Sequence, residues 1–189
     1  MVVLLVVMGS ISIFQLRTRM SGARLGSDVT YILDDQGNAR VEMVEKTYFV
    51  DADTERNFDG VVARVGQPDI DRFGKGVEES IRNLAEKTGR MGMVVSGFEA
   101  RFDKKADYGA RVYRFRWDGF AERRDGMWVV DFRAADDAKL TRDSSLAIVL
   151  PPGAMLVKVN PSPSSNDGGK LVWTGIGEMA WPYIEYRLE

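Results

Sequence analysis

Apolar and charged residues alternate along much of the second half of the chain. Three stretches have this pattern most clearly: Phe98–Phe102, Tyr113–Trp117 and Trp128–Phe132. Because successive side chains of a β-strand point to opposite faces, a period of two gives each strand one apolar and one polar face. Antiparallel sheets bury the first of these faces on a core and expose the second to water. From Met91 onward the sequence therefore predicts a β-rich domain.

The first half of the folded part predicts a β-hairpin followed by a helix. Two strand-like runs, Val29–Leu33 and Ala39–Val50, flank the turn-forming residues 34–38. The acidic side chains of Asp51 and Asp53 follow the second run, and either can cap the start of a helix. The hairpin is therefore expected to lead directly into a helical segment.

A second helix is predicted from Gln67 onward. Pro68 suits a first helical turn, and Gly89 is a typical residue just beyond a helix end. Its apolar residues are spaced by three and four positions, so they share one face: Ile70, Phe73, Val77, Ile81 and Leu84. Because Gly74 and Gly76 weaken a helix, the regular part is expected to begin only near Val77.

Further strands are predicted at residues 146–150, 155–159, 171–174 and 183–188, separated by loops rich in proline, glycine and serine. The pattern as a whole indicates an α+β fold. We expect a mainly antiparallel, β-sandwich-like domain with a two-helix insertion after the first hairpin, preceded by an N-terminal hydrophobic helix.

The N-terminus is a separate kind of segment. Residues 1–16 contain no charged side chain, and Arg17 and Arg19 follow immediately. As a helix this run is about 24 Å long, against roughly 30 Å for a bilayer core, which suits a short span or the apolar part of a signal peptide. A buried core element is the alternative. The expected division is a membrane or assembly helix at 1–19, a flexible neck at 20–27, and a β-rich extracytoplasmic domain at 28–189.

Composition excludes several classes of function. The chain has no cysteine and no histidine, so disulfides, the usual zinc sites, cysteine nucleophiles and histidine-based triads are ruled out. A formal net charge of −2 provides no basic field for nucleic acid, so no nucleic-acid partner is expected. No cofactor motif is present either, and no catalytic residue is predicted.

Four tryptophans are the candidate contact residues for a carbohydrate or peptide. Trp117 and Trp128 fall on the inferred buried face, which favours core packing. Trp173 and Trp181 lie among glycines and a proline, where an aromatic side chain can also be a loop contact. We therefore take Trp173 and Trp181 as candidate binding residues, with core packing as the alternative.

Two charged groups have both a functional and a structural interpretation. Arg111, Arg114 and Arg116 could form a stripe for an anionic ligand, but neighbouring acids favour a lattice of cross-strand ion pairs. The acidic cluster at 51–55 faintly resembles a calcium loop. In a calcium loop that started at position 51, the sixth residue would have to be glycine and the twelfth acidic, and neither condition is met. Helix capping is therefore the preferred interpretation, and no metal site is predicted.

Several longer stretches carry a family resemblance. They are Thr88–Met93, Tyr113–Ala121, Leu146–Pro152 and Leu171–Gly175. Through these stretches the chain resembles, over residues 28–189, an archaeal family of uncharacterised extracytoplasmic domains. Members of that family are tethered to membranes and are sometimes fused to a winged-helix regulator. The resemblance implies an external location and a role in sensing or interaction, with no assigned reaction.

These observations favour a non-enzymatic, membrane-anchored extracytoplasmic interaction or sensing domain in the cell envelope. Its expected partners are membrane lipid, through residues 1–16, and another envelope protein or copies of itself. The first alternative is a pilin-like filament subunit that assembles through its N-terminal helix. A hydrolase that uses paired carboxylates is the second alternative, although no pair in the sequence is distinctive.

Overall fold

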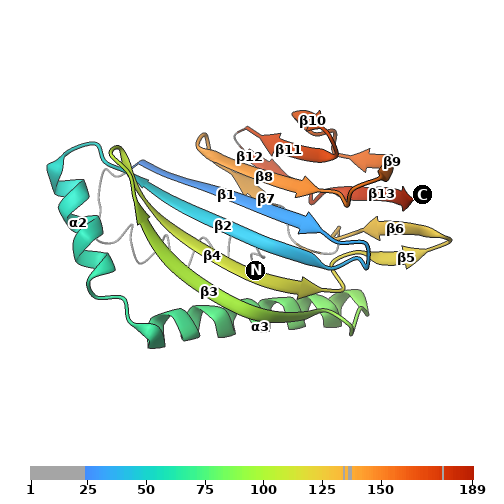
Figure 1. Ribbon diagram of the computed structural model, residues 1–189, viewed down its shortest axis with the longest axis horizontal. Helices are drawn as coiled ribbons and strands as arrows, with labels where there is room; N and C mark the ends of the chain where they lie inside the picture. Colours follow the sequence, from blue (N-terminus) through green and yellow to red (C-terminus); the bar gives the residue numbers. More distant parts are fainter. Residues whose placement is uncertain (1–23, 134, 136–137, 176) are drawn as a thin grey trace.

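The computed structural model describes residues 24–133, 135, 138–175 and 177–189. Two helices and thirteen strands lie in these residues (Figure 1). The helices are α2 (Ala52–Val62) and α3 (Gln67–Thr88). The strands are β1 (Arg24–Leu33), β2 (Ala39–Tyr48), β3 (Val94–Lys104), β4 (Tyr108–Asp118), β5 (Glu122–Arg124), β6 (Met127–Val130), β7 (Ala138–Leu140), β8 (Ser144–Val149), β9 (Ala154–Asn160), β10 (Ser165–Asp167), β11 (Lys170–Thr174), β12 (Gly177–Met179) and β13 (Tyr183–Leu188).

A seven-stranded sheet forms the larger part of the molecule, in the order β10-β11-β8-β1-β2-β4-β3. Its strands are antiparallel except for β1 and β8, which run parallel. The sequence pattern predicted the antiparallel strands but not this parallel pair, because a period of two says nothing about which strands become neighbours. The observed α+β class, with mainly antiparallel sheets and two helices, confirms that part of the prediction.

A second sheet of four strands, in the order β5-β6-β13-β9, shares one hydrophobic core with the first. Aromatic rings beside the second sheet contact the first. Measured between ring centroids, Tyr31 of β1 lies 6.3 Å from Trp181, which precedes β13, and Trp117 of β4 lies 5.2 Å from Phe132, which follows β6. Figure 1 shows α3 running beside β3, so that its C-terminal end comes close to the β5–β6 hairpin. The small sheet and α3 together cover the apolar face of the large one.

The opening hairpin is confirmed. The Asp34 carboxylate accepts hydrogen bonds from the backbone N–H groups of Gln36 and Asn38, an arrangement that closes a turn without help from the rest of the fold. Strand β1 begins at Arg24, because its pairing with β2 continues to Tyr48, so the last four residues of the segment interpreted as a neck are strand. The predicted N-terminal helix lies outside the described residues.

Both helix starts also follow local signals. The Asp51 carboxylate accepts the N–H of Thr54 at 2.7 Å and caps α2. Gly66 precedes α3, which has Pro68 in its first turn, and Gly89 ends it in a left-handed conformation with a φ of 70°. The predicted delay of the regular helix until Val77 is wrong, since α3 is helical from Gln67.

Packing explains why the glycines of α3 do not delay it. Gly74 is buried against the ring of Phe98, and a Cβ at this position would lie 3.0 Å from that ring. The neighbouring Phe73 ring stacks on Tyr113 of β4, with 4.4 Å between centroids. The missing side chain therefore lets the first turns of α3 approach the sheet closely, and the contacts offset the weak helix propensity of glycine.

Four short strands were not predicted. They are β5, β7, β10 and β12, each of three residues. Such segments are too short to show a period, and their pairing depends on partners elsewhere in the chain. The predicted strand Trp128–Phe132 ends instead at Val130, although Phe132 is buried in the core as expected.

Candidate functional site

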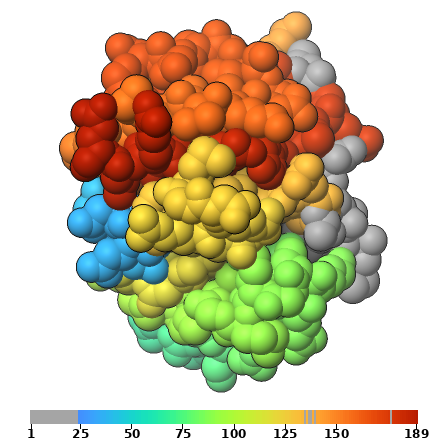
Figure 2. All heavy atoms as spheres, turned by 90° about the vertical axis from the view of Figure 1, so that its right-hand side faces the viewer, coloured from blue at the N-terminus to red at the C-terminus, as the bar shows by residue number. Residues whose placement is uncertain are grey.

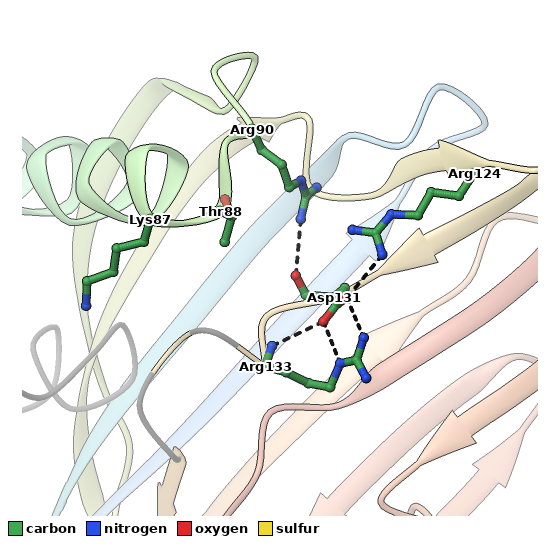
Figure 3. A pocket seen from close by; sticks show the side chains of 6 residues that line it. All are labelled: Lys87, Thr88, Arg90, Arg124, Asp131 and Arg133. Atoms are coloured by element: carbon green, nitrogen blue, oxygen red, sulfur yellow. Dashed lines mark hydrogen bonds and ion pairs between the residues drawn. The ribbon is translucent and has the colours of Figure 1, made fainter.

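A shallow pocket lies where the C-terminal end of α3 meets the β5–β6 hairpin. Figure 2 shows this end of the molecule, with the yellow hairpin between the green end of the helix and the orange and red strands. The pocket has a volume of about 480 Å³. Its lining residues, shown in Figure 3, are Lys87, Thr88, Arg90, Arg124, Asp131 and Arg133.

Arg90 forms the floor of this pocket. Its side chain is only 8% exposed, and burial lowers the pKa of its guanidinium. One nitrogen, Nη2, donates to the carbonyl oxygens of Gly119 at 2.5 Å and Phe120 at 2.8 Å, and the guanidinium lies 5.3 Å from the centre of the Phe132 ring. Arg90 therefore ties the end of α3 to the segment that leads into the hairpin.

Asp131 organises the two more exposed arginines. Its carboxylate accepts from Arg133 Nε at 2.9 Å and Nη2 at 2.8 Å, and from Arg124 Nη1 at 3.2 Å (Figure 3). The hydrogen bonds from Arg133 are the main reason that the pKa of Asp131 is lowered to about 2. At neutral pH the carboxylate is ionised, and it holds both guanidinium groups in place.

The pocket carries more positive than negative charge among the described residues. Lys87, Arg90, Arg124 and Arg133 are cationic, while Asp131 and the adjacent Glu122 are the carboxylates in contact with them. The side chains of Arg124 and Arg133 are 45% and 60% exposed, so each retains donors that face solvent. Such a surface can bind a carboxylate or another oxyanion by charge-assisted hydrogen bonds.

The low pKa of Asp131 leads to an expected pH dependence of stability. A carboxylate with a native pKa of about 2 and an ordinary value of 3.8 stabilises the fold above pH 4 and loses that contribution as the pH falls toward 2. Asp131→Asn is therefore expected to lower the free energy of unfolding by about 1–2 kcal/mol at pH 7, after allowance for solvent screening. Urea unfolding at pH 7 and pH 2 measures this, and a deficit of equal size at both pH values would contradict it.

The structure places the predicted contact residues Trp173 and Trp181 in the hydrophobic core. Each is 3% exposed, and neither lines the pocket. Trp173 donates its indole N–H to the carbonyl of Pro161 at 3.0 Å, while Trp181 packs near Tyr31 and Phe132. Core packing, the alternative interpretation of these two residues, accounts for their positions.

The cross-strand ion pairs predicted for the arginines of β4 are confirmed for Arg111 and Arg114. Arg114 pairs with Glu42 directly opposite it on β2, and Arg111 forms a buried pair with Glu45 at 2.9 Å. Arg116 contacts Asp34 and Asp118. Arg111 and Arg114 thus pair with acids on the facing strand, as expected for residues opposite one another in a sheet. The acids that contact Arg116 lie in the β1–β2 turn and on its own strand.

The acidic residues also have structural roles. Asp51 caps α2, as preferred from the sequence, and Asp53 and Glu55 pair with Arg56 and Lys104. Across residues 24–133, 135, 138–175 and 177–189, no group of three acidic side chains is arranged to hold a metal ion. Asp143 forms an ion pair with Arg24.

Sequence reasoning missed the pocket because its residues come from separate elements. Arg90 lies 41 positions before Asp131, and only the packing of α3 against the hairpin brings them together. A partial signal is nevertheless present: Asp131 and Arg133 are two positions apart, so their side chains lie on the same side of extended chain. That spacing alone does not indicate a pocket.

These features define the class of protein. It is an α+β domain in which three β-sheets, of seven, four and two strands, share one core with a long helix, and an arginine-lined pocket lies at one end. The chain belongs to a family described as a domain of unknown function (DUF4897), whose model matches residues 24–187. No curated protein matches the chain. The predicted relation to a family of uncharacterised domains is confirmed at this level.

Proposed function

We propose that this protein is a non-enzymatic binding domain, tethered at the outer face of a membrane by residues 1–16, that engages an anionic group of an envelope partner. The observation that carries this proposal is the pair of guanidinium groups held by Asp131. Arg124 and Arg133 contact the same carboxylate and remain partly exposed, so they are oriented before any ligand arrives. Orienting these side chains in advance lowers the entropic cost of binding.

The protonation states in the pocket favour binding over catalysis. A general acid or base works best with a pKa near the operating pH, which enzymes reach by raising the pKa of a carboxyl group. Here the shift is in the opposite direction, since Arg133 lowers the pKa of Asp131 to about 2. The arginines remain charged at neutral pH. The pocket can therefore hold an anion by charge and hydrogen bonds, without a group adapted to proton transfer.

The tether rests on the sequence. The uncharged run ends at Leu16 and the family match begins at Arg24, so this run precedes the matched domain. Within the part of the chain that the structure describes, neither helix has the length and hydropathy needed to cross a bilayer. The apolar run before Arg24 is the segment that we propose as the tether.

A fluorescent tetraglutamate peptide tests the pocket, because it presents carboxylates without other recognition features. We expect the full chain to bind it measurably at low salt, and Arg124→Gln combined with Arg133→Gln to weaken binding at least about tenfold, since each charged hydrogen bond contributes about 1.5–3 kcal/mol before solvent screening. Fluorescence anisotropy measures the affinity.

The matched control removes two cations elsewhere. Arg64→Gln combined with Arg82→Gln changes the net charge equally, at exposed positions outside the pocket. This variant is expected to bind the peptide like the wild type. If both double variants weaken binding equally, or if the wild type does not bind, the proposed recognition at the pocket is wrong.

A further inference from the structure

One end of the seven-stranded sheet carries a row of aromatic and basic side chains. Arg24 on β1, Tyr48 on β2 and Tyr108 on β4 are direct neighbours across the strands. The Arg24 guanidinium lies 4.8 Å from the Tyr48 ring centre, and the two tyrosine rings are 5.9 Å apart. Tyrosines flanked by cationic side chains are typical of the boundary between a membrane and water.

This end of the sheet is also where the chain leaves toward the apolar run. Seven residues, 17–23, separate Leu16 from Arg24. Fully extended, this connection spans at most roughly 29 Å. Arg24 must therefore lie within that distance of the point at which an inserted run leaves the bilayer.

An exposed apolar side chain lies at the same end. Val50, which follows β2 and precedes α2, is 58% exposed. Next to it, Phe49 packs against Phe58 of α2 and lies near Lys104. Figure 1 shows α2 and the β3–β4 turn together at this end, opposite the end that carries the β5–β6 hairpin.

The charges at this end are largely paired. Arg24 pairs with Asp143, Lys46 with Asp28, and Lys104 with both Glu55 and Asp59. Because these cations are already neutralised, a contact with lipid would depend on apolar and aromatic side chains and not on an acidic headgroup. A neutral phosphatidylcholine surface is thus the matching partner.

We infer that the row Arg24–Tyr48–Tyr108, together with Val50, rests on the lipid surface, so that the sheet stands with its other end away from the membrane. The inference depends on the proposed tether. Strand β1 extends about 30 Å from Arg24 to Leu33, at roughly 3.3 Å per residue. The pocket, built on the segment after β4, therefore faces outward at the far end, where a partner in the envelope can reach it.

A site-specific fluorophore tests this orientation, because the natural chain has no cysteine to compete for the label. Full-length V50C and R123C variants are labelled with an environment-sensitive dye and reconstituted into phosphatidylcholine vesicles. Arg123 is exposed on β5, at the pocket end. At position 50 we expect a blue shift and quenching by spin-labelled lipid, and at position 123 neither effect.

Flotation of the same vesicles distinguishes failure of the tether from failure of the orientation. If the protein does not float with the vesicles, both the tether and the orientation are wrong. If it floats but the label at position 50 is not quenched, or both labels are quenched equally, the tether stands and the orientation is wrong. Unfolding curves of the two labelled variants that match the wild type show that the label reports on the native fold.

Discussion

Replacing Arg90 with alanine is expected to lower the free energy of unfolding by about 3–5 kcal/mol. The side chain is 8% exposed and donates to the carbonyls of Gly119 and Phe120, which would lose a charged donor inside the protein. The contact with the Phe132 ring would be lost as well. Denaturant unfolding followed by far-ultraviolet circular dichroism measures the change.

Two further variants show whether the effect comes from these hydrogen bonds. Arg124→Ala removes a pocket arginine that is 45% exposed, and it is expected to cost no more than about 1 kcal/mol. Arg90→Lys keeps the charge but not the planar fork, so an intermediate loss is expected. If Arg90→Ala proves as mild as Arg124→Ala, Arg90 is not the link between α3 and the hairpin.

Trp181→Ala is expected to be equally severe, at about 3–5 kcal/mol, because it empties a large volume in the core. The indole is 3% exposed and lies near Tyr31 and Phe132. Its buried Nε1 has no hydrogen-bond acceptor among the described residues. Trp181→Phe should therefore cost much less than the alanine variant, because little beyond volume is lost.

The phenylalanine variant at position 173 provides the control. Trp173→Phe removes the hydrogen bond to Pro161, so it is expected to cost about 1 kcal/mol more than Trp181→Phe. Denaturant unfolding of all three variants tests this order. Alanine at position 181 with unchanged stability would show that the side chain does not support the core.

Most of the fold was predictable because its signals are local. The turn closed by Asp34, the Asp51 cap and the Gly89 helix end each depend on residues within a few positions of one another. The alternation through Tyr113, Phe115 and Trp117 likewise identified buried positions correctly. Such features are set by backbone geometry and hydrogen bonding, which a short stretch of sequence reveals.

The candidate site was not predictable for the opposite reason. Arg90, Arg124 and Asp131 belong to three different segments, and nothing near any one of them indicates the other two. Trp173 and Trp181 were predicted to be contact residues because glycine and proline neighbours suggest loops, whereas both side chains are buried in the core. Which segments meet is decided by the folded topology and not by local pattern.

The parallel pairing of β1 with β8 has a consequence for how the protein is made. Ser27 and Ser144 are partners in this ladder although 117 positions separate them along the chain. Contacts between such distant segments slow folding, because a long loop must close before they form. A growing polypeptide can complete the β1–β2 hairpin early, yet the other edge of β1 has no neighbour until the strand at 144–149 has left the ribosome. The β1–β8 part of the sheet therefore assembles only after residues 144–149 have been synthesised.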